Sequence, residues 1–162
     1  MKINVIGLGK LGFPMAKFLS TSDYKIQAFD INNEITSLIR NRPHEYLKYE
    51  LNLNKKKYSK NKILVFDTIL ESLKGTSISF LTVPTPSTAK GDFSNQYIIN
   101  VLPGIAKYIK ENYKSKNPYL ININSTVSPG SINGTLVNYM YKYGLKNNID
   151  YQFIYNPYFV AL

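Results

Sequence analysis

The sequence contains no cysteine and only one histidine, His44. Without cysteine the chain can form no disulfide, no thiolate metal site and no cysteine nucleophile, and we expect no metal ion. No apolar run reaches the length that crosses a membrane. The opening "MKINVIGLGK" leads straight into a strand-like pattern instead of a signal peptide, so we expect a cytoplasmic protein. His44 lies in a polar stretch, which favours a solvated side chain over a proton shuttle.

Acidic residues are scarce relative to lysine, and the 162 residues carry a formal net charge of +10. Such an excess permits binding to nucleic acid or to anionic surfaces. The densest basic run is "NKKKYSKNK", residues 54–62. A bare charge run is a weak motif, and the chain is also rich in Asn, Ile and Tyr, which indicates a compositional bias. We therefore favour a solvated loop and keep a basic nucleic-acid-binding protein as an alternative.

Short apolar runs rich in β-branched residues alternate with segments of helical periodicity. The predicted strands are residues 3–7, 24–30, 62–66, 77–83, 119–124 and 151–156. Helices are expected near 11–19, 33–40, 67–75, 96–112 and 131–143, with a loop over 41–61. Strands separated by helices form right-handed βαβ units. We expect an α/β fold: one Rossmann domain over 1–162, a doubly wound parallel sheet of about six strands in the order 3-2-1-4-5-6, with helices on both faces.

Three details of these helices follow from spacing and capping. Phe18 is expected on the inward face of the first helix with the other apolar residues. Asp67 is the predicted cap of the helix at 67–75. Pro103 and Gly104 allow a kink or a late start in the long helix. Its predicted inward face comprises Ile98, Val101, Leu102, Ile105 and Ile109.

The glycine-rich stretch "GLGKLG" lies directly between the first strand and the first helix. It places Gly7, Gly9 and Gly12 in the pattern G-x-G-x-x-G, with Lys10 and Leu11 between the last two. The first glycine permits a tight turn, the second lets a pyrophosphate approach the backbone, and the third lets the helix pack closely on the strand. The free N–H groups and positive dipole of the helix then face the phosphates. The context predicts a dinucleotide site.

Asp30 ends the second strand, at the position where an acidic side chain accepts hydrogen bonds from the adenosine ribose hydroxyls. A carboxylate there repels a 2′-phosphate, and no arginine follows at once. This favours NAD over NADP as the cofactor. The alternative is a bare turn followed by a helix-capping aspartate.

Two proline-containing loops follow the fourth and fifth strands. The first, "VPTP", contains Val83, Pro84 and Thr85, and the second, "NSTVSPGS", contains Ser125 and Thr126. Ligands in this fold lie at the carboxyl ends of the strands. The prolines stiffen the loops and the three hydroxyls can bind a ligand, so we favour binding over ordinary turn chemistry.

Six segments fall in order along the chain: "VIGLGKLGFPMA", Asp30, "FLTVPTPST", "GDFS", "INSTVSPGS" and "YNPYFVAL". Together they resemble the N-terminal domain of the UDP-glucose/GDP-mannose dehydrogenase family, over essentially the whole chain. The stretch 41–61 departs most, because "PHEYLKYEL" stands where the family usually has an E-P-G-L run. An alternative is a relative of the β-hydroxyacid dehydrogenases, whose opening is similar to "GLGKLGFPMA". The "VPTP" and "NPYF" segments argue against it.

The resemblance implies an NAD-dependent, four-electron oxidation of a nucleotide sugar's C6 alcohol to a carboxylate, in two hydride transfers. It implies that the glycine loop and Asp30 hold NAD, together with residues of the two proline loops. It further implies that Thr85 contacts the cofactor and that Thr126 lies near the reacting carbon. The cofactor-binding set expected on these grounds is Gly7, Gly9, Lys10, Leu11, Gly12, Asp30, Val83, Pro84, Thr85, Ser125 and Thr126.

Tyr158 departs from the family, which has a glutamate in the N-P-E-F segment that assists the hydrolytic step. A phenol with an ordinary pKa of about 10 cannot act as a base at neutral pH. The family's cysteine nucleophile, its lysine, its dimerisation helix and its sugar-binding domain lie in later segments. We therefore expect an NAD-binding chain that is inactive and monomeric alone, and takes a nucleotide sugar only with those segments. The alternative is a stand-alone dinucleotide-binding or regulatory module that has lost catalysis.

Overall fold

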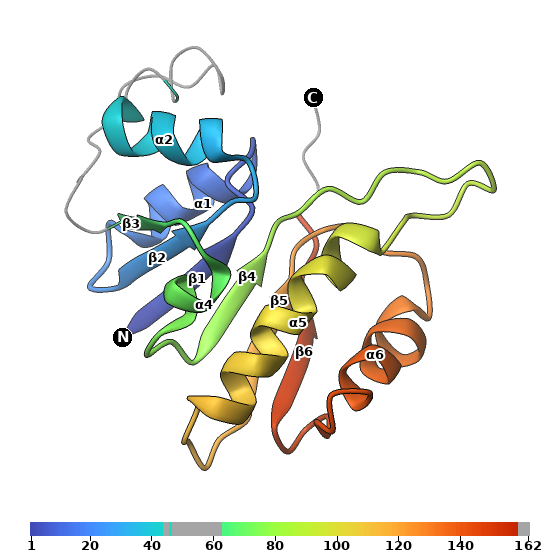
Figure 1. Cartoon of the computed structure of the whole chain (residues 1–162). Coiled ribbons are helices and arrows are strands. Elements are labelled where there is room, and N and C mark those ends of the chain that lie inside the picture. Colours follow the sequence, from blue (N-terminus) through green and yellow to red (C-terminus); the bar gives the residue numbers. More distant parts are fainter. Residues whose placement is uncertain (44–45, 47–62, 159–162) are drawn as a thin grey trace.

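A computed structural model describes residues 1–43, 46 and 63–158 of the chain. Six parallel strands form one sheet in the order β3-β2-β1-β4-β5-β6, as predicted. The strands are β1 (Lys2–Ile6), β2 (Lys25–Phe29), β3 (Ile63–Phe66), β4 (Ile78–Leu81), β5 (Tyr119–Ile123) and β6 (Tyr151–Tyr155). Figure 1 shows the chain winding outward from β1 to both edges of the sheet. His44, the basic run 54–62 and the last four residues lie outside the described residues.

Helices cover both faces of the sheet, as expected for a Rossmann fold. They are α1 (Gly12–Leu19), α2 (Asn33–Asn41), α4 (Ile69–Leu73), α5 (Gln96–Glu111), the π-helix η3 (Ser131–Leu136) and α6 (Val137–Tyr141). One apolar cluster joins the sheet to α1 and α2, and a second joins it to α4, α5, η3 and α6. In Figure 1, α4 and α5 lie in front of the sheet and α6 lies beside β6. No helix among the described residues combines the length and apolar content needed to span a bilayer.

Neighbouring residues of the strands enter opposite clusters because strand side chains alternate between the two faces. Val5 of β1 packs with α1, whereas Ile6 packs with α5. Both are buried, because each face of β1 is covered by helices. The whole inward face predicted for α5 is buried, so its helical spacing gave the correct face.

Two predictions about helices are wrong. Phe18 is 73% exposed, and the buried face of α1 is carried by Phe13, Met15 and Ala16. Asp67 is not a helix cap, because the helix begins at Ile69 and the Thr68 hydroxyl accepts the Glu71 N–H. The Asp67 carboxylate instead pairs with Arg40 of α2 at 2.6 Å.

The long helix α5 starts at Gln96 and contains Pro103 without interruption. The neighbouring Gly104 has a packing role that the sequence did not reveal. A Cβ atom there would lie 2.5 Å from Ile69 Cγ2, so the glycine lets α4 approach α5. The last predicted helix begins as a π-helix and becomes α-helical only at Val137.

Two buried tyrosines lie side by side on adjacent strands. Tyr119 and Tyr151 are register partners of β5 and β6, and neither is accessible to solvent. The Tyr119 hydroxyl contacts Ser79 Oγ at 2.6 Å and Thr76 Oγ1 at 2.9 Å. The Tyr151 hydroxyl has no hydrogen-bond partner within the described part of the chain. Burial raises the pKa of both, to about 12 for Tyr151, so both are neutral below alkaline pH.

These two tyrosines give a matched test of the buried hydroxyls. We expect Tyr119→Phe to lower the free energy of unfolding by about 1–3 kcal/mol, because Ser79 and Thr76 lose a buried partner. Tyr151→Phe should leave that free energy unchanged or raise it by about 1 kcal/mol, since its hydroxyl is buried without a partner. Urea unfolding followed by circular dichroism measures both. Equal losses of unfolding free energy in the two variants would show that the two hydroxyls do not differ in their hydrogen bonding.

Candidate cofactor-binding site

The glycine loop connects β1 to α1 in a conformation that residues with a Cβ atom could not adopt at two of its positions. Gly7 has φ +93°, and a Cβ atom there would lie 2.8 Å from the Thr82 carbonyl oxygen. A Cβ atom on Gly12 would lie 1.8 Å from the Gly7 carbonyl oxygen. Around Gly9, by contrast, a Cβ atom would meet nothing within 4 Å. The loop is therefore tight at both ends and open in the middle, as a pyrophosphate site requires.

Strand β2 holds the loop from one side. The Gly7 N–H donates to the Phe29 carbonyl at 2.9 Å, and the Leu8 N–H donates to Asp30 Oδ2 at 2.6 Å. The other oxygen, Asp30 Oδ1, accepts the Asn32 N–H at 2.8 Å. Each carboxylate oxygen can accept a second hydrogen bond. Asp30 therefore fixes the loop and keeps acceptor capacity for a hydroxyl.

Two hydroxyl groups hold the loop from other sides. Thr82 Oγ1, just after β4, donates to the Gly7 carbonyl at 2.7 Å. The buried Tyr46 hydroxyl donates to the Leu8 carbonyl at 2.5 Å, and its ring meets that of Phe13 edge to face. The first two residues of the loop are thus fully bonded within the protein.

The next four residues are different. Within the described residues, the backbone N–H groups of 9–12 donate to no partner. They precede or begin α1, where the helix dipole adds positive potential. Free N–H groups at such a helix start bind phosphate groups.

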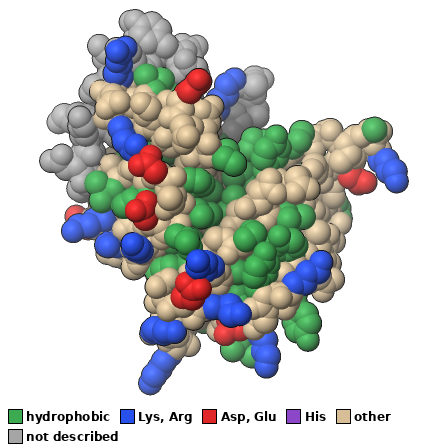
Figure 2. Space-filling model, in the orientation of Figure 1, with side chains coloured by type: hydrophobic (Ala, Val, Ile, Leu, Met, Phe, Trp, Pro, Cys, Tyr) green, Lys and Arg blue, Asp and Glu red, His purple; other side chains and the backbone are tan. Residues whose placement is uncertain are grey.

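A cavity of about 580 Å³ lies beside the loop, between the β2–α2 connection and α5. Six predicted cofactor residues line it: Gly7, Gly9, Lys10, Asp30, Val83 and Pro84. The sequence analysis missed the other lining residues, namely Ile6, Phe29, Ile31, Asn32, Ile35, Ile69, Thr82, Tyr97, Asn100 and Val101. In Figure 2, hydrophobic side chains gather in the middle of the visible face. An apolar cavity with a few polar groups suits the adenosine part of a dinucleotide.

The other predicted cofactor residues do not line this cavity. Leu11 and Gly12 lie in the first turn region of α1, where Gly12 has the packing role described above. Thr85 is partly buried in the loop after β4, and Thr126 is exposed after β5. Their contact with a cofactor stays a prediction.

Ser125 connects the two proline loops. It is 7% exposed, and its Oγ donates to the Val83 carbonyl at 2.6 Å. A second bond joins the same loops, from the Phe93 N–H to Ser128 Oγ at 2.8 Å. The Ser125 proton is thus used within the protein, and this residue supports the loop that carries Val83.

Tyr158 lies on a segment held against the end of β5. The Asn156 N–H donates to the Ile123 carbonyl at 3.0 Å, and Asn124 Nδ2 donates to the Asn156 carbonyl at 2.8 Å. Tyr158 is 46% exposed. The carboxyl ends of β1, β4, β5 and β6 thus share one edge of the sheet, as parallel strands require.

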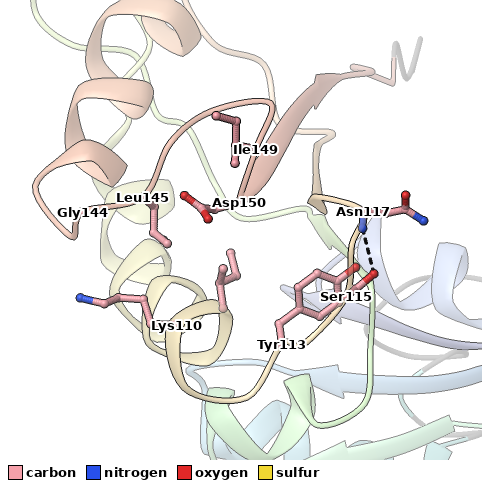
Figure 3. A pocket seen from close by; sticks show the side chains of 9 residues that line it. Lys110, Tyr113, Ser115, Asn117, Gly144, Leu145, Ile149 and Asp150 are labelled. Carbon is pink, nitrogen blue, oxygen red and sulfur yellow. Dashed lines mark hydrogen bonds between the residues drawn. The ribbon is translucent and has the colours of Figure 1, made fainter.

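A second cavity, of about 340 Å³, lies at the opposite edge of the sheet. The end of α5 and the loops leading into β5 and β6 form it (Figure 3). Lys110 and Asp150 are its charged residues, and the Asn117 N–H donates to Ser115 Oγ at 3.1 Å. This cavity lies at the amino ends of the strands, away from the edge where this fold binds ligands.

A parallel sheet of this order, with a glycine loop and an acidic residue ending β2, defines a dinucleotide-binding Rossmann domain. The model of the UDP-glucose/GDP-mannose dehydrogenase family, NAD binding domain, matches residues 1–161. The chain belongs to this family, and its cofactor is NAD. The match decides against the β-hydroxyacid dehydrogenase alternative.

Curated relatives agree with this membership. The chain is 27% identical to a GDP-mannose 6-dehydrogenase of Pseudomonas syringae pv. syringae, over 99% of this chain and 36% of the relative. It is 26% identical to a UDP-N-acetyl-D-mannosamine dehydrogenase of Pyrococcus horikoshii, over 97% of this chain and 36% of the relative. The chain thus spans about a third of the length of these relatives.

The fold is also similar to that of a solved structure, a ternary complex of GDP-mannose dehydrogenase from Pseudomonas aeruginosa. The TM-score is 0.80 at 23% identity, over 99% of this chain and 37% of that one. This agreement concerns the fold.

Two glycine substitutions separate folding from binding. We expect Gly12→Ala to lower the free energy of unfolding by about 3 kcal/mol, because its Cβ would overlap the Gly7 carbonyl. Gly9→Ala should leave stability within about 1 kcal/mol of wild type and weaken NAD binding at least about tenfold, since the methyl group fills the space of the pyrophosphate.

Thermal unfolding and calorimetric NAD titration measure the two effects. Gly134→Ala in η3 is the matched control. A Cβ atom there would also meet nothing within 4 Å, and Gly134 belongs to a different element from the glycine loop. Unchanged NAD affinity in Gly9→Ala would rule out the proposed path of the pyrophosphate.

Proposed function

We propose that this chain is the NAD-binding part of an enzyme that oxidises the C6 alcohol of a nucleotide sugar to a carboxylate in two hydride transfers. Family membership over residues 1–161 supports the reaction class. The observation that carries the proposal is the glycine loop, whose N–H groups of 9–12 have no partner among the described residues, beside an apolar cavity lined by Asp30.

The residues present fit the cofactor. The N–H groups of 9–12 would bind its pyrophosphate, Asp30 would accept the ribose hydroxyls, and the cavity would hold the adenosine. When bound, NAD supplies the hydride acceptor. Val83 and Pro84, fixed by the Ser125 hydroxyl, would support it from the β4 side.

The choice of NAD over NADP rests on Asp30. We expect the wild-type chain to bind NAD at least about tenfold more tightly than NADP, because the carboxylate repels a 2′-phosphate. Asp30→Ala should weaken NAD binding about tenfold or more and reduce that preference.

Calorimetric titration of both cofactors tests this expectation. Asp23→Ala, which removes an equal charge from an exposed turn before β2, is the control and should change neither affinity. A preference that survives Asp30→Ala would show that another group excludes the 2′-phosphate.

The reacting end of the site is incomplete in this chain. Thr126 is exposed at the carboxyl edge and would lie near the reacting carbon. Tyr158 stands where the family has a glutamate and cannot replace it as a base at neutral pH. The chain has no cysteine to form the covalent intermediate. We propose that the chain alone binds NAD without dehydrogenation, as a monomer, and that a sugar site and a dimer contact need further segments.

Tyr158 also favours a second candidate, a stand-alone dinucleotide-binding or regulatory module without catalysis. The sequence of the gene beyond Leu162 separates the two. An in-frame continuation that contains a lysine- and cysteine-bearing domain would eliminate the stand-alone module.

An activity assay tests the catalytic part of the proposal. We expect the 162-residue chain to bind NAD but to form no NADH with UDP-glucose, GDP-mannose or UDP-N-acetylmannosamine, because the nucleophile is absent. Tyr158→Glu should remain inactive for the same reason. NADH absorbance is the readout, and turnover by the wild-type chain would refute the stated need for further segments.

A further inference from the structure

Thr82 lies at the junction of three elements of the candidate site and is absent from the residues that the glycine and proline motifs pointed to. It follows β4 directly and precedes Val83. Its backbone N–H donates to the Ile6 carbonyl at 2.9 Å, which extends the pairing of β4 with β1 by one residue. Its side chain is partly buried and lines the 580 Å³ cavity.

The Thr82 hydroxyl is aimed at the backbone of the glycine loop. Its single proton lies between the Gly7 carbonyl at 2.7 Å and the Ile6 carbonyl at 3.1 Å, and the shorter contact is with Gly7. The same oxygen would lie 2.4 Å from a Cβ atom on Gly12. Thr82 Oγ1 therefore touches both ends of the glycine loop.

This contact fixes the direction of the loop that follows. The Gly7 carbonyl belongs to the peptide plane shared with Leu8, so holding that oxygen also orients the Leu8 N–H toward Asp30. With Gly7 and Leu8 fixed on both sides, the N–H groups of 9–12 keep one orientation without bonds of their own to any described residue. Preorganised donors bind an anion more tightly than donors that must first be ordered.

We propose that Thr82 is a positioning residue for the pyrophosphate of the bound dinucleotide. Its hydroxyl holds the Gly7 carbonyl and thereby aims the free N–H groups of 9–12 at the phosphates. The inference rests on the proposed function of this site, and it assigns Thr82 no contact with the ligand. A serine can supply the same hydroxyl, whereas alanine and valine cannot.

The test compares three ligands with three variants of the 162-residue chain. NAD and ADP-ribose contain the pyrophosphate, and adenosine does not. We expect Thr82→Ala and Thr82→Val to bind NAD and ADP-ribose about tenfold more weakly, with the adenosine affinity unchanged. Thr82→Ser should bind all three ligands within about twofold of wild type.

Each other pattern overturns the inference. Equal losses for all three ligands would indicate a general disturbance of the cavity, and a loss for NAD alone would place the effect at the nicotinamide. Wild-type affinities in Thr82→Ala, or a loss in Thr82→Ser equal to that in Thr82→Ala, would remove the role of the hydroxyl. Thermal unfolding of every variant shows whether it is folded.

A ligand-free measurement separates this inference from the proposed function. Amide hydrogen exchange followed by NMR should speed up about tenfold at Leu8 in Thr82→Ala, with no change at Ile105 in the middle of α5. If the wild-type chain bound no dinucleotide, the proposed function would fail while the exchange result still tested the contact. Unchanged exchange at Leu8 would show that Thr82 does not hold the loop.

Discussion

The close contact of α1 with the end of β1 is the constraint on which the rest of the site depends. Only 1.8 Å would separate a Cβ on Gly12 from the Gly7 carbonyl, so the helix can start there only without a side chain. This approach brings the positive end of α1 to the carboxyl edge of the sheet. The same edge receives Asp30 from β2 and Thr82 from β4, because the three strands are parallel neighbours.

The polar groups of this edge fall into two sets. Those of Gly7, Leu8, Ser125 and Asn156 are bonded inside the protein and hold the loops in place. The N–H groups of 9–12 donate to no residue that the structure describes, and the side chains of Thr126 and Tyr158 are exposed. A ligand can therefore bind without breaking the bonds that shape the edge, which keeps the cost of ordering the site low.

Local patterns predicted most of the fold and part of the site. Apolar runs gave all six strands, their alternation with helices gave the strand order of a Rossmann fold, and helical spacing gave the buried face of α5. Spacing failed for Phe18, since Phe13, Met15 and Ala16 form the buried face of α1 and Phe18 points to solvent. The capping prediction failed for Asp67, because Thr68 caps the helix and Asp67 pairs with Arg40 instead. Ile31 and Tyr97 were missed because no local motif marks them, and Thr82 was missed because it precedes the VPTP loop.

The sequence by itself determined the class of the domain, its cofactor motif and the departure at Tyr158, because glycine spacing and strand–helix alternation are local properties of the chain. Tertiary structure decided which of these residues meet. Only the parallel pairing of β1 with β4 places Thr82 against Gly7, 75 residues away. Only the packing of α5 on the sheet makes Tyr97 and Asn100 a wall of the cavity. These contacts join segments that are distant in sequence, and their geometry depends on packing that no local pattern encodes.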